Sequence, residues 1–427
     1  MEDERQVPRR RARWPLWTAL AVVAALVGCV LPTALVAGRL LDPPPRSAGD
    51  PAPGSDRTPD GPAARLAGAI GAQLDRQAEA LLRGDRAGFL AVAEPAARDD
   101  LARQFTSLRA LRVAVWRAEP SGEPTPTPDR PGQWRQLVTY RYCLVEPACT
   151  PSPVLAGTRW RAGADGPRLV AVEPSKSERT GTRPWEVSEL AVSHGPRTLV
   201  ATTPDQRGRL PALLAAAEAA AVVADRYVVD GVRPDRYRIF YAGRDEWRRW
   251  YGGDRPEWTG GYVVTVGGGH HEVVLNAAAL RSGGLAELLR HELTHAASLP
   301  AGGWSGESAW WLVEGIAELA GSADRPVVGY SGLDEVRRLV AGGWDGGLEG
   351  LAPAADAPAG RVTASYGIGY LAVRHLLDRY GEQRLLAFFR AVVHDRRPVA
   401  DAAREVFGEP WPTLRDDCVA YVRTAAG

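Results

Sequence analysis

The sequence predicts an α+β protein with an N-terminal transmembrane helix, a small α+β domain and a larger domain in which strands give way to helices. Three observations support this prediction. Residues 14–37 contain no charged side chain, residues 63–174 show helical spacing followed by strand-like alternation, and the second half of residues 189–427 shows mainly helical spacing. At 427 residues, with 45% hydrophobic and 24% charged side chains, the chain is long enough for two or three folded domains.

The charge balance argues against one large class of function. Lys and Arg total 52, Asp and Glu total 51, and the net charge is +1. Nucleic-acid-binding proteins normally carry a clear basic excess, so we expect no nucleic-acid partner. The four cysteines are too few for a disulfide-built scaffold, and they lack the paired Cys-x-x-Cys spacing of a zinc ribbon.

The N-terminus predicts a membrane anchor. Residues 1–13 form a basic tail with five arginines, and the uncharged run from Trp14 to Ala37 covers 24 residues. A helix of about 20 apolar residues crosses a bilayer core, and basic residues collect on its cytoplasmic side. We therefore expect a cytoplasmic tail at 1–13, a transmembrane signal anchor at 14–37 in the cell membrane, and an extracytoplasmic globular part.

The cysteines add an alternative anchor and a disulfide. Leu26-Val27-Gly28-Cys29 resembles a bacterial lipoprotein cleavage site, in which Cys29 would carry the lipid and tether the chain to the same side. Cys143 and Cys149 lie six positions apart, and an oxidising compartment would favour a disulfide between them. Cys418 has no evident partner and is expected to be a buried thiol.

A Pro- and Gly-rich linker at 38–62 leads into a small α+β domain at 63–174. Apolar spacing predicts a helix from Ala63 to Arg83 and a second one near 96–111. Strands are expected at 111–117, 134–145, 154–162 and 169–173. The stretch from Ala80 to Leu90 resembles the helical start of nuclear transport factor 2-like domains. Their cone-shaped fold holds a pocket that can bind a ligand, host chemistry or do neither, and a packing or docking module is the favoured role here.

A polar linker at 175–188 precedes the largest domain, at 189–427. Its first half predicts alternating strands and helices, and its second half is expected to be helical to the end. The predicted elements are a strand at 197–202, an Ala-rich helix at 206–227, a strand at 237–241 and a β-pair at 262–266 and 272–275.

The residues that carry chemistry lie in a predicted helix from Leu285 to Leu299, which contains His291-Glu292-Leu293-Thr294-His295. Histidines at positions i and i+4 project from one helical face and can bind a single Zn²⁺ ion together. Glu292 follows the first histidine and can take a proton from the attacking water. The chain has seven histidines in all, so a chance match to this pattern has odds of about one in a hundred or lower.

A second predicted helix, from Trp310 to Leu319, contains Glu314, which is separated from His295 by 18 residues. His-Glu-x-x-His, 18 residues and then Glu resembles the gluzincins, specifically the aminopeptidase N-like peptidase clan. This resemblance implies a zincin-type peptidase domain with a mixed sheet and a mostly helical C-terminal part. It also implies site roles, namely His291, His295 and Glu314 as zinc ligands, Glu292 as general base and Glu318 as the carboxylate that orients a ligand histidine.

Two further roles follow from the same resemblance. The stretch around Tyr366 resembles the Tyr-x-x-Gly helix of these peptidases, so Tyr366 would stabilise the oxyanion, with Tyr370 as the alternative and a plain core tyrosine as the simplest option. Upstream, the stretch 267–272 occupies the place of the edge strand that pairs with a substrate backbone. Its two histidines, His270 and His271, would line either the cleft or a loop.

The expected function is therefore a membrane-anchored, extracytoplasmic zinc peptidase that hydrolyses peptides or proteins. The chain contains no Gly-x-Met-Glu-Asn element, by which this family grips a free amino terminus, so endo- and exopeptidase action are both open. The alternative is a surface-anchored ligand-binding or sensor protein with a vestigial peptidase fold. The intact Glu292 argues against that alternative, because an inactive site needs no base.

Overall fold

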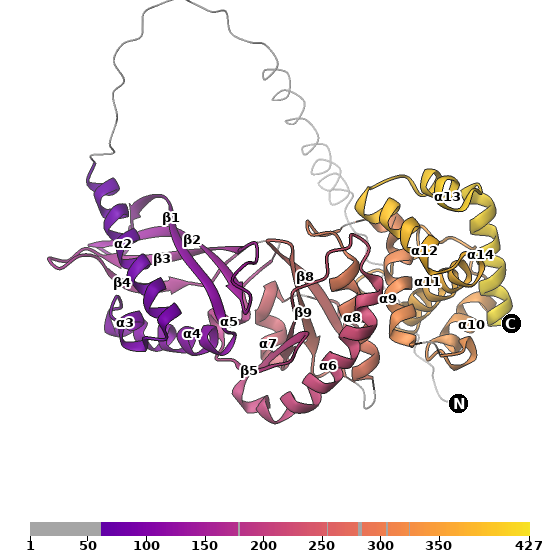
Figure 1. The fold of residues 1–427 in the computed structure, drawn as a ribbon, viewed down its shortest axis with the longest axis horizontal. Coiled ribbons are helices and arrows are strands. Elements are labelled where there is room, and N and C mark those ends of the chain that lie inside the picture. Colours follow the sequence, from indigo (N-terminus) through magenta and orange to yellow (C-terminus); the bar gives the residue numbers. More distant parts are fainter. Residues whose placement is uncertain (1–60, 178–179, 254, 281–283, 305, 324) are drawn as a thin grey trace, which may run out of the picture. The chain divides into compact units, whose positions relative to one another are not determined.

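Two β-sheets with their flanking helices, followed by a C-terminal group of helices, make up the described part of the chain (Figure 1). This computed structural model describes residues 61–427, apart from 178–179, 254, 281–283, 305 and 324. The described residues, from Gly61 onward, belong to one compact unit. The predicted tail at 1–13, the anchor at 14–37 and nearly all of the linker at 38–62 lie outside the described residues.

The predicted fold class included a transmembrane helix, and this part is corrected. Within the residues that the structure describes, no helix is long and apolar enough to cross a membrane. The longest described helices, α2 (Pro62–Arg83) and α11 (Ala359–Tyr380), have 22 residues each, but both carry charged side chains. The described residues form a mixed helix-and-sheet structure.

The first sheet is an antiparallel meander with the order β1-β2-β3-β4, in which each strand pairs with its neighbour in sequence. Its strands are β1 (Val113–Pro126), β2 (Gln133–Leu144), β3 (Ser152–Arg161) and β4 (Arg168–Glu173). Three helices precede it, namely α2, α3 (Arg86–Leu90) and α4 (Arg98–Ala110). α2 and α4 contact β1, because apolar residues recurring every three or four positions give each helix one buried face.

The second sheet is mixed, with the order β5-β6-β7-β9-β8. Its strands are β5 (Ala191–His194), β6 (Thr198–Thr202), β7 (Tyr237–Ala242), β8 (Gly261–Gly267) and β9 (His270–Asn276). β6, β7 and β9 are parallel, and β5 and β8 are the antiparallel edges. The expectation that 267–272 forms the edge strand is wrong. These residues form the β8–β9 turn and the start of β9, which pairs with β7 on its other side, so β8 is the edge.

Alternate residues of the central strands face two different cores, because successive side chains of a strand point to opposite faces. Ile239 and Val273 pack with α6 (Leu210–Ala224) and α8 (Leu285–Ser298). Their neighbours Phe240 and Val274 lie in a core shared with the first sheet and its helices. Trp185, in the short helix α5 (Pro184–Val187), is buried in that shared core as well.

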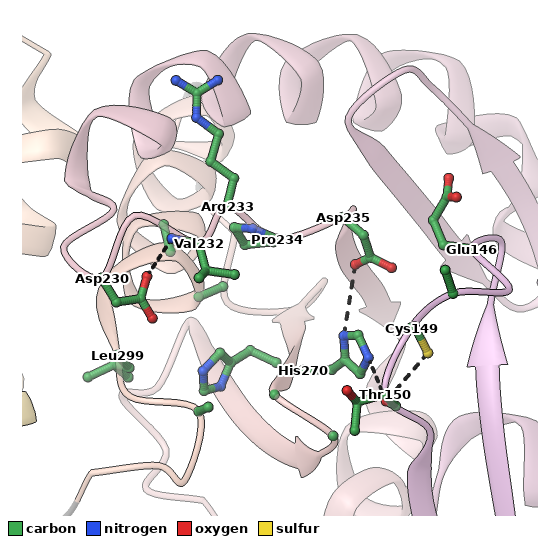
Figure 2. A pocket seen from close by; sticks show the side chains of 17 residues that line it. Glu146, Cys149, Thr150, Asp230, Val232, Arg233, Pro234, Asp235, His270 and Leu299 are labelled. Atoms are coloured by element: carbon green, nitrogen blue, oxygen red, sulfur yellow. Dashed lines mark hydrogen bonds and ion pairs between the residues drawn. The ribbon is translucent and has the colours of Figure 1, made fainter.

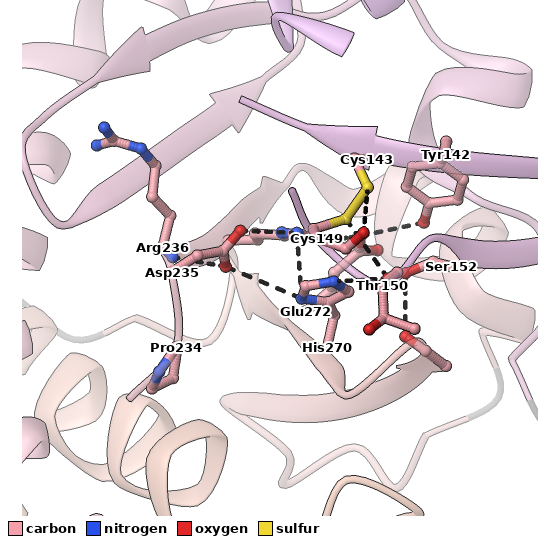
Figure 3. Close-up of polar contacts among 12 residues, drawn as sticks. Tyr142, Cys143, Cys149, Thr150, Ser152, Pro234, Asp235, Arg236, His270 and Glu272 are labelled. Atoms are coloured by element: carbon pink, nitrogen blue, oxygen red, sulfur yellow. Dashed lines mark hydrogen bonds and ion pairs between the residues drawn. A yellow bond between two sulfur atoms is a disulfide. The ribbon is translucent and has the colours of Figure 1, made fainter. Parts of the chain in front are cut away.

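A buried polar cluster lies between the two sheets. Glu272 of β9 is 1% exposed and accepts hydrogen bonds from the hydroxyls of Tyr142 on β2, at 3.2 Å, and of Tyr251. Arg238 of β7 lies 3.9 Å from the same carboxylate and is equally buried. Figure 3 shows Tyr142 reaching from the first sheet toward Glu272. The burial of this charge is therefore compensated by groups from both sheets.

The predicted disulfide is present. Cys143 at the end of β2 is bonded to Cys149 in the loop before β3, with their Cα atoms 6.0 Å apart (Figure 3). Cys418 is a buried free thiol, as predicted, and burial raises its pKa to about 12.

Helices form the remainder of the chain, as predicted. They are α9 (Trp310–Ser322), α10 (Leu333–Ala341), α11, α12 (Glu382–Phe389), α13 (Val399–Phe407) and α14 (Trp411–Ala426), and a short π-helix (Arg390–His394) follows α12. A third core holds them together, with fully buried Trp311, Leu371 and Phe388 among its members. One further short helix, α7 (Arg244–Arg249), follows β7.

Candidate metal centre

Two adjacent helices bring the predicted ligands together. α8 presents His291 and His295 one turn apart, and α9 presents Glu314. α8 is fixed because Leu289 and Leu293 are buried against the second sheet, and α8 and α9 contact each other. A side chain four positions along a helix lies on the same face, which explains why both histidines point to one place.

The three donor atoms converge. His291 Nε2 lies 3.1 Å from His295 Nε2, and Glu314 Oε2 lies 3.2 Å from each of these nitrogens. A proton on one Nε2 can link these atoms by hydrogen bonds, and when both nitrogens are deprotonated, two lone pairs and a carboxylate oxygen face one point. Two imidazoles and a carboxylate are ligands that zinc favours. The residues present therefore fit a zinc ion.

The neighbouring imidazoles also determine the charge of Glu314. Burial acts to raise the pKa of its carboxyl, but His295 and His291 outweigh the burial and hold the pKa well below its usual range. Glu314 is therefore an anion at neutral pH, as a metal ligand must be.

Glu292, the predicted base, is buried beside these ligands. Burial raises the pKa of its carboxyl, with the two imidazoles acting in the opposite direction. Within the described structure its Oε2 atom is buried without a hydrogen-bond partner. Buried polar atoms are normally hydrogen-bonded. This oxygen therefore has an acceptor position open for a hydrogen bond from a bound molecule.

The edge strand β8 begins against Glu292. A Cβ atom on Gly261 would lie 2.7 Å from Glu292 Oε1 and 2.9 Å from its Cγ, whereas one on Gly260 would meet only Leu288 at an ordinary 3.7 Å. The absence of a side chain at Gly261 therefore leaves room for the Glu292 carboxylate. Nothing in the sequence distinguishes Gly261 from Gly260, so the contact of Gly261 with Glu292 is visible only in the structure.

Glu318 lies on the far side of His291 from the other ligands. Its Oε1 atom accepts a hydrogen bond from His291 Nδ1 at 3.1 Å, and its Oε2 atom accepts one from the Tyr330 hydroxyl at 2.8 Å. Glu318 therefore contacts both His291 and Tyr330, and no sequence signal points to Tyr330.

Tyr366 on α11 lies beside the metal ligands. Its ring centre is 6.0 Å from that of His291 and 4.9 Å from that of Trp310. Burial, followed by the charges of Glu314 and Glu292, raises the pKa of Tyr366 well above its usual value, so its hydroxyl remains a donor. Tyr370, the alternative, instead stacks on Tyr330 with ring centres 4.4 Å apart.

His270 and His271 are not among the residues that converge at the metal centre. They line a separate cavity of about 650 Å³ between the loop that carries Cys149 and the segment 230–235 (Figure 2). The His270 ring donates to the Thr150 carbonyl from Nε2, at 3.1 Å, and accepts from Arg238 at Nδ1. Burial lowers the pKa of His271 to about 4. Burial, and then the charge of Arg238, lower the pKa of His270 as well, so both rings favour the neutral form.

No family model and no curated protein matches this chain. Among solved structures, an M1 zinc metallopeptidase from Deinococcus radiodurans is similar at 16% identity and a TM-score of 0.32, over 74% of this chain and 62% of that one. A mutant M1 zinc metallopeptidase from the same organism, bound to a Tyr-Ser-Ala substrate, matches at 15% identity and a TM-score of 0.32, over 74% of this chain and 61% of that one. This chain spans less than two thirds of the length of these structures, and the likeness is too distant to establish a shared activity.

Proposed function

We propose that this protein is a zinc-dependent peptidase that hydrolyses peptide bonds in peptides or proteins. The observation that carries the proposal is the convergence of His291, His295 and Glu314 next to a buried glutamate with an unpaired oxygen. A cation-binding site alone would not need Glu292, and a buried carboxylate without a partner is costly unless it serves a reaction.

The side chains around the centre divide the work. A zinc ion bound by the three ligands would supply Lewis-acid activation of water and of the scissile carbonyl. Glu292 takes the proton of the attacking water and then passes it to the leaving amine, a role for which a pKa raised by burial is suited.

Tyr366 is the proposed donor to the oxyanion. Its hydroxyl remains protonated at neutral pH, and its ring is held against His291 and Trp310. A donor fixed in place before the reaction stabilises the charge that develops on the carbonyl oxygen without further reorganisation.

We also place the globular part outside the cytoplasm. The Cys143–Cys149 disulfide supports this location, because disulfides persist in oxidising compartments and are rare in the cytosol.

Replacing Glu292 by Gln tests the proposal, because it keeps the shape of the side chain and removes its basicity. We expect the variant to retain about one zinc per chain while turnover of a mixed peptide library falls at least about 100-fold. Glu287→Gln is the matched control. Glu287 lies on the same helix but pairs with Arg325 at 2.6 Å, so its loss should leave turnover near the wild-type value.

Two outcomes would contradict the proposal. Near-wild-type turnover of Glu292→Gln would exclude this residue as the base. A zinc-loaded wild-type protein that cleaves no member of the library would favour the binding or sensor protein instead.

A further inference from the structure

We propose that Tyr330 is a positioning residue of the metal centre, which holds Glu318 in the orientation that fixes the ligand imidazole of His291. The inference rests on the zinc site proposed above. Tyr330 lies in the loop between α9 and α10, outside the helices that supply the ligands, and its hydroxyl donates to Glu318 Oε2 at 2.8 Å. The other oxygen of Glu318 faces His291 Nδ1 at 3.1 Å.

This chain of hydrogen bonds determines which nitrogen of His291 can bind a metal. A proton on Nδ1 is donated to Glu318, so the lone pair of the neutral ring is at Nε2, the atom that faces His295 and Glu314. A carboxylate that is held at both oxygens cannot rotate away from the imidazole. The orientation of the His291 ring therefore depends on Tyr330, because Tyr330 holds the Glu318 carboxylate in place.

The surroundings of Tyr330 fix its ring as well. The ring is 6% exposed and stacks on Tyr370 at an interplanar angle of 20°. A Cβ atom on Gly332 would lie 2.8 Å from its Cε1 atom, and one on Gly367 would lie 3.0 Å from the same atom. Two glycines thus leave room for the ring where any side chain would displace it.

The hydroxyl is also a permanent donor at neutral pH. Burial, and then the charge of Glu318, raise the pKa of Tyr330 well above its usual value. The proton stays on the tyrosine oxygen, so the hydrogen bond to the carboxylate persists across the range in which a peptidase would work.

Tyr330→Phe tests the role, because it removes one oxygen and keeps the stacked ring. We expect the zinc affinity of the full chain, measured by competition with a chromophoric chelator, to fall about 10-fold, the lower end of the range for partners of metal ligands. Tyr370→Phe is the matched control. It removes a hydroxyl from the same stacked pair but not from the hydrogen-bond chain, so its zinc affinity should equal that of wild type.

A double-mutant cycle separates positioning from packing. Once Glu318→Gln has disturbed the carboxylate, Tyr330→Phe should cost much less zinc affinity than it does in the wild-type background. The thermal unfolding midpoint of the metal-free protein measures whether Tyr330→Phe disturbs the packing. We expect this midpoint to change little while the zinc affinity falls.

The inference would be overturned by a Tyr330→Phe variant with wild-type zinc affinity. It would equally be overturned if Tyr370→Phe weakened zinc binding to the same extent. These outcomes are distinct from failure of the proposed function, because a wild-type protein that binds zinc but cleaves no peptide leaves the affinity comparison intact.

Discussion

Glu314 and Glu318 lie one helical turn apart on α9, yet their oxygens face different nitrogens of the same imidazole. Glu314 Oε2 lies 3.2 Å from His291 Nε2, and Glu318 Oε1 lies 3.1 Å from His291 Nδ1. The first contact is with the edge of the ring that faces His295, and the second is with the opposite edge. Two chemically identical side chains therefore contact opposite edges of one imidazole.

This difference predicts a ranking of two variants. Glu314→Ala removes a ligand and should abolish tight zinc binding, whereas Glu318→Ala removes an orienting partner and should weaken binding or activity about 10–100-fold. Zinc content after dialysis against a chelator, followed by competition titration, measures both. The reverse ranking would make Glu318 the ligand and break the 18-residue spacing from His295.

Of the individual site residues, local sequence pattern alone predicted the two histidines on α8 and little else. His291 and His295 could be paired because one helical turn brings positions i and i+4 together. Glu314 and Glu318 needed a family resemblance, because the 18 residues between α8 and α9 contain a loop whose path no periodicity describes. Tyr330 comes from another loop, and only the three-dimensional path of the chain places it beside Glu318.

Single elements bring the proposed base, Glu292, and the proposed oxyanion donor, Tyr366, close to His291, His295 and Glu314. β8 is a free edge strand that starts at Gly261, in contact with Glu292, and α11 carries Tyr366 across α9. In both places a glycine allows the close contact: Gly261 lies against Glu292, and Gly369 of α11 lies against the backbone of α9. For each of these glycines, another glycine of the chain whose added Cβ atom would meet no close contact can serve as a control.

Gly261→Ala should lower turnover and leave zinc in place. Its Cβ atom would enter the space of the Glu292 carboxylate at 2.7 Å, so the base would have to move. A displacement of about 1 Å at a catalytic group can lower the rate about 100-fold. Gly260→Ala, whose Cβ atom meets only Leu288 at 3.7 Å, should retain most of the activity. Equal turnover of the two variants, measured on one peptide substrate, would show that β8 does not constrain the base.

The crossing of α9 and α11 predicts a stability difference. A Cβ atom on Gly369 would lie 2.8 Å from the Trp311 carbonyl oxygen of α9, which is backbone and cannot give way. Gly369→Ala should therefore destabilise the protein by about 1–3 kcal/mol, the usual cost of overpacking. Gly360→Ala, near the start of the same helix and with nothing within 4 Å, should change stability by less than about 1 kcal/mol. Urea unfolding of both variants measures this difference. Equal midpoints would contradict a tight contact between α9 and α11.

The positions of the helices and strands in the chain were largely predictable, but the pairing of the strands in space was not. The helices at 63–83 and 285–299 and the β-pair at 262–266 and 272–275 follow from local apolar spacing, which the structure reproduces in α2, α8, β8 and β9. The edge position was assigned to the wrong strand, because local pattern does not say which strands lie on either side. Only the pairing of β9 with the distant β7 makes β8 the edge.

In the whole molecule the two sheets share one apolar core. Phe240 and Val274 of the second sheet belong to the same buried cluster as Trp116 and Trp160 of the first. The buried Glu272 likewise depends on Tyr142 from the first sheet. A strand that is apolar on both faces signals two buried faces, but the sequence does not reveal what covers the second one. The small N-terminal α+β part is that cover.

The last prediction follows from this shared core and concerns two truncated proteins. A fragment of residues 189–427 would expose the face of the second sheet that carries Leu199, Phe240 and Val274, all 0% exposed in the intact unit. Each such side chain contributes about 1.5–3 kcal/mol when fully buried, so exposing the three removes much of a typical stability of about 5–15 kcal/mol. We expect this fragment to lack a cooperative thermal transition and to bind zinc weakly. A fragment of residues 61–427 keeps the cover and should melt in a single transition whose midpoint rises with zinc. Circular dichroism melts with and without zinc compare the two, and cooperative, zinc-stabilised unfolding of residues 189–427 alone would show that the first sheet is dispensable for the metal centre.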